Sequence, residues 1–119
     1  MRPRLLIVED KELDCELLIQ IFEKTYDLRL AADGKTALDV ASEELPDLIL
    51  MDIGLPGISG LDAVRAIRET GSEVPIIAVS SRVMPGDRER ALAAGCDDFM
   101  AKPIDDLALV DMVGGLLAR

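Results

Sequence analysis

Histidine and tryptophan are absent from the 119-residue chain, and its only aromatic side chains are one tyrosine and two phenylalanines. Without histidine the chain has no imidazole for general acid–base catalysis, for a Ser-His-Asp triad or for metal ligation. Any chemistry must therefore come from carboxylates, hydroxyls, lysine and the backbone. Half of the residues are hydrophobic, which is enough for a core, and the scarcity of aromatic residues means that this core has to be aliphatic.

Cysteines and long apolar runs are also scarce. Cys15 and Cys96 stand alone in unrelated contexts, which is typical of reduced thiols in a cytosolic protein rather than of a metal site or a disulfide framework. The apolar run that leads to Glu9 is only four residues long, too short for a signal peptide or a membrane span. We therefore expect a cytoplasmic protein that does not act at a membrane.

Positive charge is in short supply. The chain has 13 Lys and Arg against 23 Asp and Glu, a formal net charge of -10. Since nucleic-acid binding depends on neutralising phosphates with Lys and Arg, we expect no direct binding to nucleic acid. The excess of acidic residues is compatible with binding a hard divalent cation, which takes oxygen ligands.

Short apolar runs alternate with segments whose apolar residues have helical spacing. Strands are predicted at residues 5–8, 27–31, 48–51, 74–79 and 98–101, and helices at 12–25, 35–44, 61–71, 85–94 and 105–117. Ser59 is the expected N-cap of the third helix, and Pro85 the first-turn residue of the fourth. The alternation predicts an α/β fold with parallel strands and helices on both faces. The short connections predict a single domain over residues 1–119.

Four of the five predicted strands end in polar residues, namely Glu9-Asp10, Asp52, Ser80 and Lys102. A carboxylate such as Asp52, at the end of a buried strand, is costly unless something cationic or hydrogen-bonding meets it. The carboxyl ends of parallel strands share one edge of a sheet, where ligands bind. We therefore expect these side chains to converge on one crevice.

Such a cluster suits metal-assisted phosphoryl transfer. Packed carboxylates repel one another unless a divalent ion lies among them, and Mg²⁺ prefers oxygen ligands. One carboxylate can act as nucleophile and form an acyl phosphate. The metal, a lysine and a hydroxyl can then neutralise the new phosphoryl oxygens.

Four spaced motifs carry a resemblance to a known family: Val8-Glu9-Asp10, Leu50-Met51-Asp52-Ile53-Gly54-Leu55-Pro56-Gly57, Ile76-Ile77-Ala78-Val79-Ser80 and Gly95-Cys96-Asp97-Asp98-Phe99-Met100-Ala101-Lys102-Pro103. Together they resemble the receiver domain of two-component response regulators over the whole chain. The resemblance implies a flavodoxin-like (βα)5 doubly wound sheet with strand order 2-1-3-4-5. It also implies a signalling switch that takes a phosphoryl group from a phosphohistidine of a histidine kinase or phosphotransfer protein.

The resemblance assigns a role to each matching position. Asp52 is the expected phosphoacceptor. Glu9 and Asp10 are the expected acidic pair that holds Mg²⁺, with Mn²⁺ as a substitute, and Asp52 and the backbone carbonyl of Gly54 complete the protein ligands. Because Gly54 offers no side chain to steer a hydrolytic water, no lifetime of the phosphorylated state is predicted.

The remaining matches concern the response to phosphorylation. Ser80 corresponds to the switch hydroxyl that turns towards the phosphoryl group, and Phe99 to the switch aromatic that swings inward with it, although Phe99 also suits ordinary core packing. Lys102 is expected to pair with the phosphoryl oxygens, and Lys102-Pro103 to form a cis peptide. Lys11 stands where many relatives have Asn. We expect it either to be a solvated residue at the start of the helix or to lean over the crevice. Arg82 is a candidate to cover the site.

Phosphorylation is expected to change the surface formed by the last two helices and the last strand, and so to regulate a protein partner. The chain itself is expected to be a monomer or a weak phosphorylation-dependent dimer. The last helix has apolar residues over a wide arc, which suits either one broad core-facing stripe or an additional exposed stripe for a partner. Gly114-Gly115 within it indicates either a fraying end or a close backbone approach.

Two forms of the protein stay open: a stand-alone regulator without an output domain, or a receiver excised from a multidomain transcriptional regulator or hybrid histidine kinase. In either form it would catalyse only its own phosphorylation and dephosphorylation. A flavodoxin-type electron carrier is disfavoured because Glu9-Asp10 would repel the FMN phosphate. An aspartyl phosphatase is disfavoured because it usually has a second Asp where this chain has Gly54. A binding module that is never phosphorylated is disfavoured because every residue that the phosphorylation chemistry needs is present.

Overall fold

The computed structural model describes residues 2–55, 59–81 and 84–119. The described elements follow one another in strict alternation: β1 (Arg4–Val8), α1 (Glu12–Phe22), β2 (Asp27–Ala31), α2 (Gly34–Glu43), β3 (Leu48–Asp52), α3 (Gly60–Glu69), β4 (Ile76–Ser80), α4 (Asp87–Ala94), β5 (Asp98–Ala101) and α5 (Asp106–Leu117). All strand pairs are parallel, and the sheet order is β2-β1-β3-β4-β5. The predicted flavodoxin-like fold is confirmed.

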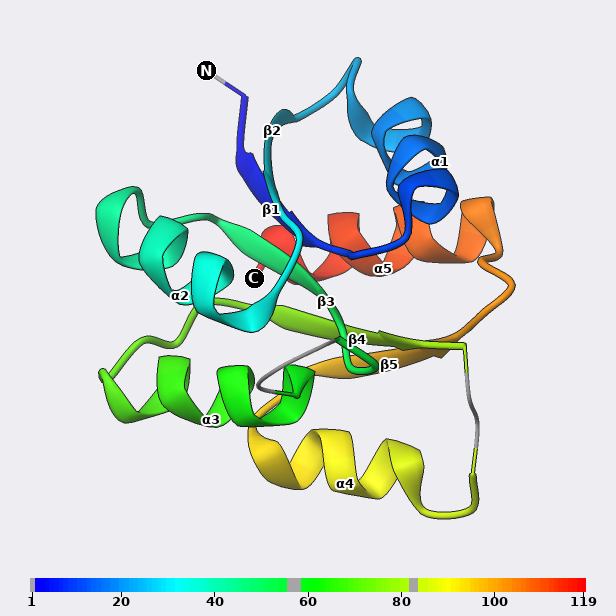
Figure 1. Ribbon diagram of the computed structural model, residues 1–119. Coiled ribbons are helices and arrows are strands. Elements are labelled where there is room, and N and C mark those ends of the chain that lie inside the picture. Colours follow the sequence, from blue (N-terminus) through cyan, green and yellow to red (C-terminus); the bar gives the residue numbers. More distant parts are fainter. Residues whose placement is uncertain (1, 56–58, 82–83) are drawn as a thin grey trace.

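Neighbouring residues of each central strand belong to two different cores, one on each face of the sheet. Helices α2, α3 and α4 cover one face, and α1 and α5 cover the other (Figure 1). Leu6 and Ile49 pack under the first group of helices, whereas Leu5 and Leu50 pack under the second. Two-sided burial explains why these strands read as continuous apolar runs. Each such Leu or Ile contributes roughly 1.5–3 kcal/mol relative to an exposed side chain.

The central strand β3 is buried along its whole length, including Asp52 at its end. α3 begins directly against this strand end, with Ser59 as its N-cap as predicted. A Cβ on Gly60 would lie 2.4 Å from the carbonyl oxygen of Asp52, so only glycine fits there. The packing of α3 thus fixes the backbone that carries Asp52.

Two predicted helix boundaries were wrong. α1 ends at Phe22 rather than at Thr25, because the amides of Thr25 and Tyr26 turn back to the Phe22 carbonyl before β2 begins. α4 begins at Asp87 rather than at Pro85, because Gly86 has a left-handed φ of 87° that no helix continues through. The other boundaries agree with the predicted ones or differ from them by at most two residues.

At the amino edge of the sheet, opposite the polar strand ends, Arg68 of α3 joins several elements. Its guanidinium donates to the carbonyls of Gly95 and Ser72 and to the carboxylate of Asp97, at 3.0, 3.1 and 3.1 Å. The same Asp97 oxygen accepts from the Ile76 amide at 2.8 Å. The ends of α3 and α4 and the starts of β4 and β5 are therefore held by one hydrogen-bond network.

The apolar arc of α5 is divided between core and surface. Leu109, Val113 and Leu116 are buried, whereas Leu107 is 79% exposed and Val110 is 40% exposed, so an exposed apolar stripe does exist. Among the described residues, the helices are all too short or too polar to cross a bilayer.

The two glycines of α5 lie in open space. A Cβ on Gly114 or Gly115 would meet no atom within 4 Å outside its own helix, and α5 continues to Leu117. The close backbone approach considered from the sequence is therefore excluded.

We expect Gly114→Ala and Gly115→Ala each to raise the free energy of unfolding by about 0.5–1 kcal/mol, because alanine loses less backbone freedom in a helix. Urea unfolding followed by circular dichroism measures this change. Gly60→Ala is the matched control and should destabilise the fold, because its Cβ has no room. Lower stability of both α5 variants would contradict the open surroundings of these glycines.

Candidate functional site

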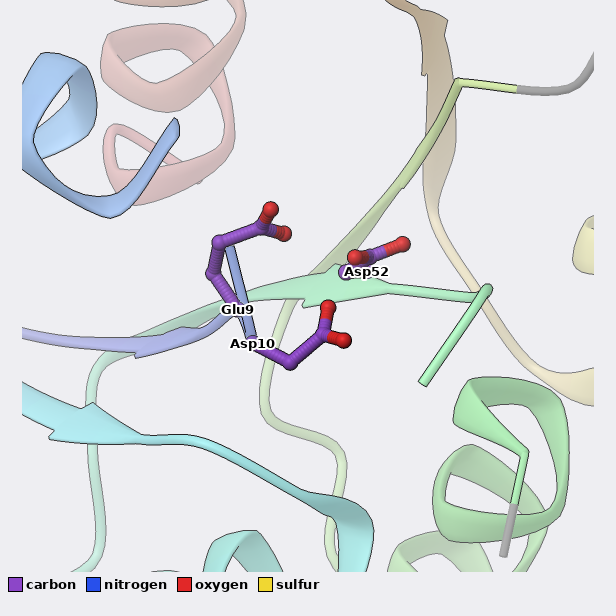
Figure 2. Close-up of side chains that lie close together, drawn as sticks. All are labelled: Glu9, Asp10 and Asp52. Carbon is purple, nitrogen blue, oxygen red and sulfur yellow. The ribbon is translucent and has the colours of Figure 1, made fainter. Parts of the chain in front are cut away.

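The carboxyl edge of the sheet gathers three carboxylates from two neighbouring strands. Glu9 and Asp10 directly follow β1, and Asp52 ends β3 beside it (Figure 2). One carboxylate oxygen from each of the three residues lies within 4.8 Å of the other two. The predicted convergence of these acids is therefore present.

The three acids differ in burial. Glu9 is 5% exposed and Asp52 is 4% exposed, whereas Asp10 is exposed to solvent. The Glu9 amide donates to the Ala31 carbonyl at 3.0 Å, which extends the pairing of β1 with β2 and fixes the backbone there. The Gly54 amide donates to Oδ1 of Asp52 at 2.9 Å, which orients this carboxylate.

Lys102 brings a positive charge to these acids from beyond β5. Its Nζ donates to Oε1 of Glu9 and to Oδ2 of Asp14, both at 2.8 Å, and lies 3.8 Å from Oδ2 of Asp52. Its backbone amide donates to the Ser80 carbonyl at 2.7 Å, and the Lys102-Pro103 peptide is cis, as the resemblance implies. The lysine is thus tied to the end of β4 as well as to the acids.

The charges at the site do not balance, because one ammonium faces more than one buried carboxylate. Burial, together with a hydrogen bond to Asp52, raises the pKa of Glu9 to about 8 against the opposing effect of Lys102. Burial disfavours the charge of Lys102, but its hydrogen bonds to Asp14 and Glu9 outweigh this and raise its pKa. Without a further cation, the site therefore favours retaining a proton.

Asp14 is the residue at this site that the sequence did not reveal. It lies in the first turn of α1, and the hydrogen bond from Lys102 lowers its pKa. Nothing in the sequence separates it from Glu12 and Glu16 on the same helix. Only the position of α1 over the sheet brings Asp14, and not its neighbours, to the lysine.

The other predicted site residues are placed as follows. Ser80 is 5% exposed at the end of β4. Phe99 is partly buried on β5 and packs against the core under α2, α3 and α4. Lys11 is exposed at the N-cap of α1, as a solvated helix-start residue would be. Pro56, Gly57 and Arg82 lie outside the described residues.

The donor set fits a hard divalent cation. Three carboxylates can converge on one point, and all of their donor atoms are oxygens, which Mg²⁺ prefers. Burial is the largest cause of the raised pKa of Glu9, and the neighbouring Asp52 adds to it, so Lys102 alone does not offset the cost of ionising Glu9. A divalent cation among the three would supply further positive charge in place of a proton.

These features define a doubly wound α/β domain with an acidic site at the carboxyl edge of its central strands. Residues 5–114 match the family described as response regulator receiver domain, and the chain belongs to this family.

Relatives of two kinds match almost the whole chain. The polar-differentiation response regulator DivK of Brucella anthropi is 37% identical over 120 residues, which cover 98% of this chain and 98% of DivK. Hybrid signal transduction histidine kinase I of Dictyostelium discoideum is 40% identical over 126 residues, which cover 98% of this chain. The chain spans only 7% of that kinase, and only 26% of the response regulator PleD of Caulobacter vibrioides.

Solved receiver domains have the same fold. The receiver domain of a sensor histidine kinase from Pseudomonas aeruginosa superimposes with a TM-score of 0.91 at 34% identity over 100% of both chains, and its structure contains a magnesium ion in the active-site cleft. A receiver domain from a Francisella response regulator gives a TM-score of 0.93 at 26% identity over 99% of this chain and 98% of that one.

We expect the metal-free protein to lose stability as the pH rises from about 4.5 to about 8. Over this range the folded state retains a proton on Glu9 that the unfolded state has released, so a higher pH favours unfolding. Glu9→Gln cannot ionise and should flatten this dependence. Urea unfolding at pH 5 and pH 8 without divalent cations measures the difference.

The exposed Glu12→Gln variant is the control for this experiment and should keep the pH dependence of the wild type. Wild-type stability that stays level or rises over the same range would contradict the raised pKa of Glu9.

Proposed function

We propose that this domain is a phosphorylation-controlled signalling switch, in which Asp52 accepts a phosphoryl group from a phosphohistidine of a histidine kinase or phosphotransfer protein. The observation that carries the proposal is the meeting of Asp52 with two further carboxylates and with Lys102 at one edge of the sheet. Membership of the receiver family supports it.

In the proposed reaction an oxygen of Asp52 attacks the phosphorus atom of the donor. A P–O bond forms as the P–N bond to the imidazole breaks, and the imidazole nitrogen keeps the electron pair of the broken bond. The Gly54 amide holds the Asp52 carboxylate in orientation through Oδ1. The carboxylate is therefore oriented before the donor arrives, and such positioning lowers the barrier to the transfer.

Glu9, Asp10 and Asp52 are the proposed protein ligands of Mg²⁺, with the Gly54 carbonyl as a fourth and Mn²⁺ as a substitute ion. When bound, the ion supplies positive charge against the developing phosphoryl oxygens. Lys102 neutralises another of these oxygens, and the Ser80 hydroxyl donates to the phosphoryl group. Both residues reach the site from strand ends that are already joined by the Lys102 amide and the Ser80 carbonyl.

The proposed output is a change in the surface of α4, β5 and α5. New contacts of Ser80 and Lys102 with the phosphoryl group would alter the loops after β4 and β5, and with them the packing of Phe99. This surface carries exposed apolar side chains that a protein partner, or a second phosphorylated copy in a weak dimer, could cover, namely Leu92, Leu107 and Val110. Partner regulation through this surface is the proposed signal.

Incubation with acetyl phosphate and Mg²⁺ tests the phosphoacceptor. The wild-type protein should gain one phosphoryl group by intact-mass spectrometry, and Asp52→Asn should gain none, because an amide is not a nucleophile of this kind. Asp62→Asn, on the exposed surface of α3, is the matched control and should be phosphorylated like the wild type. A wild-type protein that gains no mass would refute the proposed function.

Metal binding can be tested separately, without a phosphoryl donor. Asp10 is exposed, so Asp10→Asn should leave the thermal midpoint unchanged while it weakens Mg²⁺ binding by about tenfold or more through the loss of a charged ligand. Isothermal titration calorimetry measures the affinity. Asp39→Asn, an equal charge change on the surface of α2, should bind Mg²⁺ like the wild type. Equal affinities for both variants would remove Asp10 from the ligand set.

A further inference from the structure

We propose that Asp14 competes with the phosphoryl group on Asp52 for the ammonium of Lys102, and thereby lowers the fraction of the protein that is phosphorylated. This inference rests on the proposed function. It makes Asp14 a positioning residue on α1, one that acts on phosphorylation through Lys102 and does not itself contact the reacting atoms.

The geometry shows an ammonium that is already engaged. Lys102 Nζ has three hydrogen atoms to donate. It donates to Glu9 and to Asp14, both at 2.8 Å, while Asp52 lies farther away at 3.8 Å. A phosphoryl group on Asp52 would therefore have to attract the Lys102 ammonium against its hydrogen bonds to Glu9 and Asp14.

The two carboxylates that hold Lys102 are not equivalent. Glu9 also belongs to the group of acids that can share a cation, and a bound cation would offset its charge. Asp14 is not part of that group, so it keeps its full charge for Lys102 when the metal site is filled. Charge-assisted hydrogen bonds of this kind are roughly twice as strong as neutral ones.

The exposure of Asp14 predicts a graded effect and not a complete block. Its side chain is 31% exposed, whereas that of Lys102 is 9% exposed. When Lys102 turns to the phosphoryl group, water can therefore solvate the carboxylate left behind. The competition then has the modest strength of a partly exposed ion pair.

The test compares the phosphorylated fraction and the binding of beryllofluoride, a non-covalent mimic of the phosphoryl group, at saturating Mg²⁺. Asp14→Asn keeps a hydrogen-bond acceptor but removes the charge. We expect the ratio of phosphorylated to unphosphorylated protein with acetyl phosphate, and the affinity for beryllofluoride, each to rise about threefold to tenfold.

Two control variants separate competition from other causes. Glu16→Gln makes the same charge change at an exposed position of α1 and should stay within about twofold of the wild type, as surface charges contribute little. Asp14→Glu keeps the charge and should also retain wild-type behaviour. Beryllofluoride affinity should change in Asp14→Asn while Mg²⁺ affinity measured without the anion stays close to that of Glu16→Gln, whereas a purely structural role would change both.

The outcomes distinguish this inference from the proposed function. If the wild type gains no phosphoryl group and binds no beryllofluoride, the proposed function fails and this inference fails with it. If the wild type does both, but Asp14→Asn behaves like Glu16→Gln or binds beryllofluoride more weakly, only the role of Asp14 is refuted.

Discussion

The contact between the Lys102 ammonium and the carboxylates of Glu9, Asp14 and Asp52 is the interaction on which the site depends. Lys102 reaches them from the loop after β5, while the acids come from β1, β3 and α1. The lysine therefore links segments that are far apart in the sequence but meet at the carboxyl edge of the sheet. Its single positive charge is smaller than the negative charge that it faces, so the arrangement favours a further cation.

The sheet order explains why these residues meet. β1 and β3 are neighbours at the centre of the sheet, so the acids that follow β1 lie beside Asp52, and β4 and β5 follow in sequence on one side. Two aliphatic cores hold these strands from both faces. Gly60 adds a contact against the backbone of Asp52 that tolerates no side chain. The backbone that carries the Asp52 carboxylate is thus positioned by the two cores and by the packing of Gly60.

The sequence predicted the fold and the meeting of Glu9, Asp10, Asp52 and Lys102 at one edge of the sheet, because both depend on features that are local in the chain. Continuous apolar runs identify buried strands, and the polar residue that follows each run must lie at the shared edge. Asp14 could not be found in this way, since the rotation of α1 over the sheet decides which of its acids meets Lys102. The early end of α1 and the late start of α4 were missed for a related reason: a turn at Phe22 and a left-handed Gly86 override a pattern that suits a helix.

The network around Arg68 joins two helices and two strands at the amino edge of the sheet. At the amino edge, one guanidinium ties the Gly95 end of α4 to α3 and, through Asp97, to the starts of β4 and β5. At the carboxyl edge, the opposite end of α4 follows the loop after Ser80. Moving the Gly95 end of α4 along the sheet would break these bonds, and Arg88 in the first turn of α4 adds an ion pair to Asp98 of β5 at 3.3 Å. A rearrangement of α4 that left this network intact would therefore have to keep its Gly95 end in place.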